Sequence, residues 1–173
     1  VERRPAEFFS HFNLGRTYVG LKRYEEGLLE LQRALEFNDE SASAHLKANA
    51  HLVVGQLLLL HKNDPDGAIT AAGRSLACNP DLAAARLLMG NAYMAKGQFE
   101  RAEAEFRMAL KLFHSCRRGR DLCDETVSAE DTLYASLARS QVRDGRHREA
   151  ADNLQRAIRL NPHRAEHYLE LGR

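Results

Sequence analysis

The chain has 173 residues, of which 44% are hydrophobic, which is enough for one domain with a continuous apolar interior. Its 25 lysines and arginines nearly balance its 24 aspartates and glutamates, so no overall charge favours nucleic acid or anionic lipid. The most apolar stretch, residues 52–60, is too short to span a bilayer. We therefore expect neither nucleic-acid binding nor membrane insertion.

Four similar blocks recur along the chain, and abundant Ala, Leu, Glu, Gln and Arg favour helix in all of them. Each block places small residues and bulky ones at matching intervals. In chain order they carry Leu14-Gly15, Tyr18, Gly27, Leu31 and Ala34; Val54-Gly55, Leu58, Ala68, Ala72 and Ser75; Met89-Gly90, Tyr93, Ala102, Phe106 and Ala109; and Tyr134, Leu137-Ala138, Gln141, Ala150, Leu154 and Ala157. This pattern resembles the tetratricopeptide repeat.

The resemblance implies an all-α fold: an α-solenoid of stacked antiparallel helical hairpins that winds as a right-handed superhelix. Small residues are expected where two helices of a hairpin cross closely, because a large side chain there would overpack the contact. We read residues 1–173 as a single array segment. Its predicted parts are repeats at about 8–41, 48–82, 83–114 and 131–164, a partial fifth repeat at 165–173, and an insert at 115–128.

The spacing of the blocks is irregular in two places. Residues 40–47 favour helix and are expected to lengthen the first helix of the second block by one to two turns. The second helix of the third block is expected to end near His114, before the insert. A basic run and then an acidic one follow in the insert, which is read as a solvated loop; docking of a charged partner is the alternative.

In the tetratricopeptide family, the first helices of the hairpins line a concave groove that binds partners. Carrying the groove positions over to this chain predicts apolar anchors, with polar side chains that set the orientation of a helix or extended peptide. These positions are Phe9, Phe12, Arg16, Val19, Asn49, Leu52, Gln56, Leu59, Leu87, Asn91, Met94, Arg139 and Val142. The alternative is that several of these side chains only complete the core.

Three functional classes follow from this reading. The leading one is a protein-protein interaction scaffold that binds a peptide or helix of a partner protein. The others are self-association through the terminal repeat and a non-catalytic targeting region of a larger multidomain enzyme. We expect no enzyme activity, no catalytic residues and no cofactor in this segment, because no catalytic motif or phosphate-binding loop occurs.

Histidines and cysteines are read in the same way. His11 and His51 stand where the family often has a bulky residue, so packing is favoured for both. His163 and His167 share a helical face, but no further ligand stands at a zinc spacing, so no metal is expected. Cys116 and Cys123 could form a disulfide in an oxidising compartment; free thiols in a cytoplasmic location are favoured.

Overall fold

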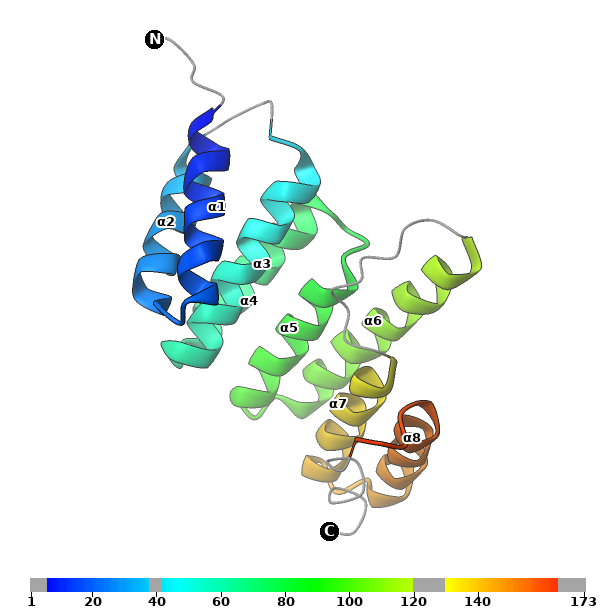
Figure 1. Cartoon of the computed structure of the whole chain (residues 1–173). Coiled ribbons are helices and arrows are strands. Elements are labelled where there is room, and N and C mark those ends of the chain that lie inside the picture. The colour runs from blue at the N-terminus through cyan, green and yellow to red at the C-terminus, as the bar shows by residue number, and fades with distance from the viewer. Residues whose placement is uncertain (1–5, 38–41, 120–129, 165–173) are drawn as a thin grey trace. The chain divides into compact units, whose positions relative to one another are not determined.

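The structure is a computed structural model that describes residues 6–37, 42–119 and 130–164. These residues form eight helices and no strand, and consecutive helices pair as antiparallel hairpins (Figure 1). The helices are α1 (Ala6–Gly20), α2 (Tyr24–Glu36), α3 (Ala44–His61), α4 (Pro65–Cys78), α5 (Ala83–Ala95), α6 (Phe99–Gly119), α7 (Glu130–Arg143) and α8 (His147–Leu160). The predicted all-α class of stacked hairpins is confirmed. None of the described helices has the length and apolar character needed to cross a bilayer.

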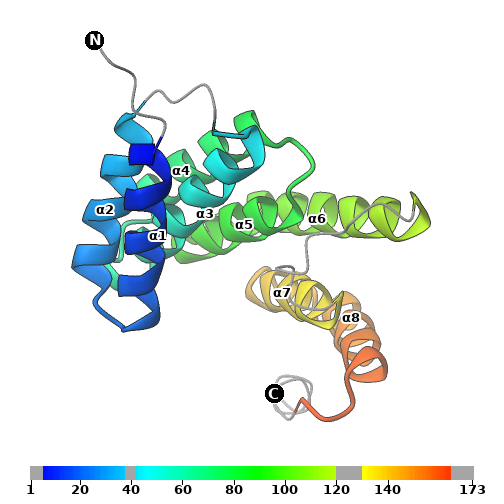
Figure 2. The same ribbon diagram turned by 45° about the horizontal axis from the view of Figure 1, so that its top comes forward.

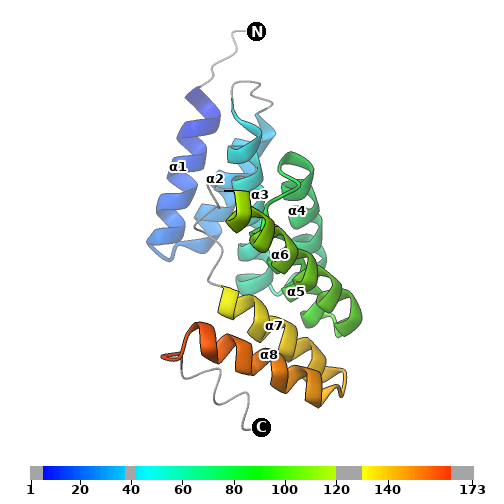
Figure 3. The same cartoon turned by 90° about the vertical axis from the view of Figure 1, so that its right-hand side faces the viewer.

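The chain divides into two compact units, Val1–Pro80 and Asp81–Arg173. In the first unit, α1 pairs with α2 and α3 with α4, and α2 also packs against α3. In the second unit, α5 pairs with α6 and α7 with α8, and α6 also packs against α7 (Figures 2 and 3). In both units, the second helix of one hairpin therefore contacts the first helix of the next.

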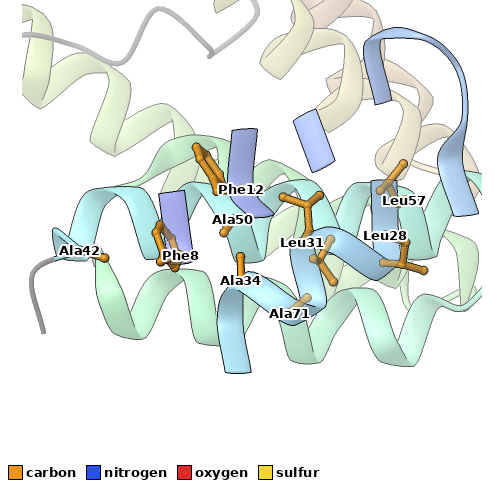
Figure 4. Close-up of a cluster of buried hydrophobic side chains, with 10 residues drawn as sticks. Phe8, Phe12, Leu28, Leu31, Ala34, Ala42, Ala50, Leu57 and Ala71 are labelled. Atoms are coloured by element: carbon orange, nitrogen blue, oxygen red, sulfur yellow. The ribbon is translucent and has the colours of Figure 1, made fainter. Parts of the chain in front are cut away.

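Each unit has its own apolar core. In the first unit, a cluster of ten buried residues draws on all four helices (Figure 4). Phe8 and Phe12 of α1 stack with their ring centroids 5.7 Å apart, and both belong to this cluster. In the second unit, Phe106 of α6 and Leu133 of α7 are fully buried in one cluster, and Leu154 of α8 is buried in another. No single hairpin buries its apolar face alone, which is why the hairpins stack.

Glycines lie where the helices of a hairpin cross most closely. A Cβ atom on Gly15 of α1 would lie 2.8 Å from the side chain of Leu31 in α2. A Cβ atom on Gly27 of α2 would lie 3.1 Å from the carbonyl oxygen of Gly15. In α5, a Cβ atom on Gly90 would lie 2.4 Å from the Phe106 ring. These approaches leave no room for a side chain, as the repeat pattern predicts.

In the second hairpin, a small polar residue forms a hydrogen bond to the backbone of the facing helix. The hydroxyl of Ser75 in α4 is buried and donates to the carbonyl oxygen of Ala48 in α3, at 2.8 Å. A buried hydroxyl needs such a partner, because an unpaired one is costly in an apolar interior. Ser75 therefore acts as the small residue of this crossing and keeps its polar atom satisfied.

The four described hairpin turns share one backbone geometry. In each, the residue two positions before the second helix is left-handed, with φ values of 61° at Lys22, 51° at Asn63, 71° at Gly97 and 79° at Gly145. Glycine adopts this region without steric cost, whereas a residue with a Cβ atom is strained there. In the first turn, Gly20 ends α1 and the positive φ falls on Lys22, which carries a Cβ atom.

The two irregular intervals are resolved differently. α3 has 18 residues and begins at Ala44, capped by the Ser43 hydroxyl, which confirms a longer first helix in the second hairpin. α6 runs past the predicted end near His114 and reaches Gly119, because residues 115–118 contain no helix breaker. The rest of the insert lies outside the described residues. The boundaries of the repeats themselves stay predictions.

A buried polar network joins three helices of the second unit. The carboxylate of Glu103 in α6 is 4% exposed and accepts hydrogen bonds from Gln141 of α7 and Arg146 of the α7–α8 turn. The side chain of Asn153 in α8 donates to Gln141 at 2.8 Å. Burial alone would raise the pKa of Glu103, but these bonds and the charges of Arg107 and Arg146 outweigh it and hold the pKa below its usual value.

Replacing Lys22 by glycine should stabilise the chain, because it relieves the strain of a side chain at positive φ. The expected gain in the free energy of unfolding is about 0.5–1 kcal/mol. Gly97→Ala is the matched control, and it should lose about as much, since it introduces the same strain at the same place in another turn. Chemical denaturation measures both; a Lys22→Gly variant less stable than the parent would contradict the assignment.

Gly90→Ala should destabilise the chain by about 1–3 kcal/mol, because the added methyl group meets the buried Phe106 ring. Gly73→Ala in α4 is the control: nothing lies within 4 Å of its Cβ position, so helix propensity alone should stabilise it by up to about 1 kcal/mol. Thermal unfolding of the two variants should therefore shift in opposite directions. In a double-mutant cycle, Phe106→Leu should offset part of the Gly90→Ala loss.

Glu103→Gln should cost about 3 kcal/mol at pH 7, because it breaks a buried ion pair on one side only. A folded-state pKa below the unfolded value means that the stabilisation is present above the unfolded pKa, near 4.5, and is lost as pH falls through the folded pKa. The parent chain should thus lose more stability than Glu103→Gln in that acid range. Glu100→Gln, an exposed change in the same helix, should follow the parent in urea unfolding at each pH.

Candidate functional site

The candidate groove of the first unit is built on α1 and α3. Phe9, Phe12, Arg16 and Val19 recur every three or four residues in α1, so one side of the helix carries them all. The corresponding positions in α3 have the same spacing and are Asn49, Leu52, Gln56 and Leu59. Each set therefore lies on one face of its helix, and that these faces form a binding groove stays a prediction.

The exposed fractions of these side chains divide the positions into two groups, those that a ligand can reach and those that pack in the core. Phe12 and Leu52 are only 4% and 5% exposed, so they pack inside the unit and offer little surface to a ligand. Phe9 is 37% exposed, and Arg16 and Gln56 are also exposed. The Arg16 guanidinium lies over the Phe12 ring, 5.7 Å from its centroid, which is the geometry of a cation–π contact. The exposed Phe9 ring and the exposed Arg16 side chain therefore remain available to a ligand on α1, and Arg16 is in contact with the buried Phe12 ring.

The candidate groove of the second unit is built on α5 and α7, which contact each other directly. Leu87, Asn91 and Met94 of α5 are half-buried, and Leu87 and Met94 pack against the core. In α7, Arg139 is exposed and Val142 is 41% exposed. This surface combines partly covered apolar side chains with an amide and a guanidinium, a mixture suited to peptide recognition.

Of the two histidines read as packing residues, His11 is held by two contacts. Its ring stacks on Phe37, with the centroids 5.5 Å apart, and its Nδ1 lies 2.6 Å from a carboxylate oxygen of Glu30. Glu30 is buried, and its pKa is lowered first by the hydrogen bond with His11 and also by the charge of Arg33. His11 thus links α1 to α2.

His51 has a different environment, which the sequence reading missed. It lines an open hollow of about 560 Å³ between α2, α3 and α4, together with Leu35, Val54, Ala71 and Arg74. We call this feature the α2–α4 hollow. Burial, and then the charge of Arg74, lower the pKa of the His51 imidazole, so it is neutral at pH 7. In the sequence, the only signal for this hollow is an arginine and a histidine in neighbouring helices. That combination is too common to indicate a site.

Other candidate residues fall partly outside the described part of the chain. Within the described residues, no three His, Cys, Asp or Glu side chains gather as a metal site would require. His167, Cys123 and the side chain of Cys116 lie outside that part, and so do most of the insert and the partial fifth repeat. Cys78, at the end of α4, is a half-buried free thiol.

Solved structures with the same architecture are numerous. A MamA protein from Desulfovibrio magneticus RS-1 matches with a TM-score of 0.71 and 19% identity, over 94% of this chain and 78% of that one. The Pseudomonas aeruginosa protein pilF matches at 0.74 and 17% identity, over 96% and 66% of the two chains. YrrB, described as a tetratricopeptide repeat protein with an unusual peptide-binding site, matches at 0.72 and 16% identity, over 93% and 72%. At sequence identities this low, the similarity to these structures shows a shared fold and nothing more.

No curated protein is similar enough in sequence to support a comparison. Two family models described as tetratricopeptide repeat match the sequence, one at residues 59–124 and the other at residues 12–83 and 136–173. Together these matches reach nearly every part of the chain, including all four hairpins. The chain belongs to the tetratricopeptide repeat family.

Proposed function

We propose that this chain is a protein-interaction scaffold whose first helices bind a peptide or helix of a partner protein. The family and the stacked hairpins support the scaffold role. The observation that supports the groove is on α1, where Phe9 is 37% exposed and Arg16 is exposed about two turns further along the same helix face. Aromatic and arginine side chains are enriched among the residues that carry most of the binding energy at interfaces.

The proposed ligand lies along α1 and α3 with an apolar side chain against Phe9. Its acidic or carbonyl groups face Arg16 and Gln56, which set its direction. Leu59 and Val19 are half-buried and supply apolar surface beside them. In the second unit, apolar surface for the ligand comes from Leu87, Met94 and Val142. Polar groups that set its direction come from Asn91 and Arg139.

The role needs no chemistry beyond binding, so we propose that the segment itself is not catalytic. Self-association through the terminal repeat stays a prediction, because residues 165–173, which would carry it, lie outside the described part of the chain. The third class, a targeting region of a larger enzyme, is compatible with the same groove and also stays a prediction.

The test uses peptides selected from a random twelve-residue phage library against the parent chain, with affinities then measured by fluorescence anisotropy. Arg16→Glu should weaken a groove-binding peptide about tenfold or more, because it replaces attraction by repulsion. Phe9→Ala should weaken it by a similar factor, because it removes an anchor. Both residues are exposed enough for melting temperatures to stay within about 2 °C of the parent.

Lys111→Glu is the matched control, since it reverses an exposed charge on a second helix. Its affinity for the same peptides should equal that of the parent. Peptides whose binding is unaffected by both Arg16→Glu and Phe9→Ala would contradict the groove on α1. Loss of the helical signal in either variant would instead mean that these residues belong to the core.

A further inference from the structure

The α2–α4 hollow lies on the side of α3 opposite the proposed groove. His51, Val54 and Leu58 line it, whereas the groove positions of α3 are Asn49, Leu52, Gln56 and Leu59. At 3.6 residues per turn, these two sets point in nearly opposite directions. The hollow is therefore a separate feature of the first unit, and its volume falls in the range of about 300–1,000 Å³ that is usual for ligand sites.

The hollow has an apolar part and a polar end. Leu35, Val54, Leu58 and Ala71 supply the apolar lining, and Val54 and Ala71 belong to the buried core cluster shown in Figure 4. His51, in the middle of α3, lines the hollow close enough to Arg74 for the charge of that arginine to lower its pKa. Glu36 and Arg74, close to the ends of α2 and α4, also line the hollow.

The charge of Arg74 is not neutralised by any described residue. Three other cations of this unit form ion pairs: Arg23 with Glu26, Arg33 with Glu30 and Lys62 with Glu25. Arg74 has no hydrogen bond or ion pair to the described residues, although Glu36 lines the same hollow. The nearby His51 imidazole is neutral at pH 7, so it can donate one hydrogen bond without adding charge.

We propose that the α2–α4 hollow binds a peptide segment of a partner protein in which an aliphatic side chain stands next to a single carboxylate. The aliphatic side chain covers Val54, Leu58 and Ala71. The carboxylate pairs with the Arg74 guanidinium, a charge-assisted bond stronger than a neutral one.

Glu36 narrows the chemistry of this ligand. Its carboxylate accepts a hydrogen bond from a peptide N–H of the segment, a donor that a bare anion lacks. It also repels a second negative charge at the same end, which disfavours a phosphate dianion and selects one carboxylate. A basic residue of the ligand at this place is disfavoured as well, because the positive charge of Arg74 would repel it.

The test is an NMR titration of the ¹⁵N-labelled full chain with N-acetyl-leucyl-aspartyl amide. We expect the backbone amides of His51, Val54, Ala71 and Arg74 to shift progressively, with a dissociation constant on the order of millimolar for so small a probe. N-acetyl-leucyl-asparaginyl amide has the same shape without the charge, and N-acetyl-glycyl-aspartyl amide keeps the charge without the apolar side chain. Each should bind at least about fivefold more weakly.

Arg74→Glu should weaken binding of the leucyl-aspartyl probe about tenfold or more. Arg16→Glu, in the proposed groove, should leave it unchanged, which separates this site from the groove whatever the outcome there. Shifts confined to α1 and the groove side of α3, equal affinity for the aspartyl and asparaginyl probes, or full binding by a folded Arg74→Glu variant would each overturn the proposal.

Discussion

The structure depends on close approach of two helices at a few small residues in each hairpin. Gly15 and Gly27 face each other across the first crossing so tightly that the backbone oxygen of one lies within contact of where the other's side chain would begin. Close crossing brings the bulky neighbours Phe8, Leu31 and Phe106 into full burial. Because bulky residues are then buried between helices, each hairpin has an apolar face that only a neighbouring hairpin can cover.

Because the hairpins bury most of their apolar side chains against each other, few apolar side chains stay exposed for recognition of a partner. Phe12 and Leu52 have the spacing of groove residues, yet the packing of each hairpin on the next buries them. What stays exposed on the same faces is sparser: one aromatic ring at Phe9, a few polar side chains and the arginine at 16. A scaffold of this kind obtains affinity from a small number of anchors, and the family relationship by itself does not specify which partner supplies the matching groups.

The fold was predictable because its signal is periodic. Glycine, alanine and serine at fixed intervals identified the four hairpins. Two local features were not predictable in the same way. Lys22 is left-handed because the chain has to turn there, although its own side chain disfavours this backbone, and α6 continues to Gly119 because nothing in residues 115–118 stops it. Burial of groove positions depends on neighbouring hairpins, so spacing within one helix could not reveal it.

The net charge of the chain is a poor guide to the electrostatic interactions of its individual side chains. A formal net charge of +1 suggests that electrostatics matters little, but the balance hides unequal local pairing. Arg146 pairs with a buried carboxylate in the network that joins three helices, whereas Arg74 borders an apolar hollow and makes no ion pair with the described residues. The first arrangement serves stability, because removing Arg146 would leave the buried Glu103 carboxylate without this ion pair. The second leaves the attraction of Arg74 available to the ligand that we propose for the hollow, so the specificity of that proposed site would come from one side chain beside apolar surface and not from the overall charge.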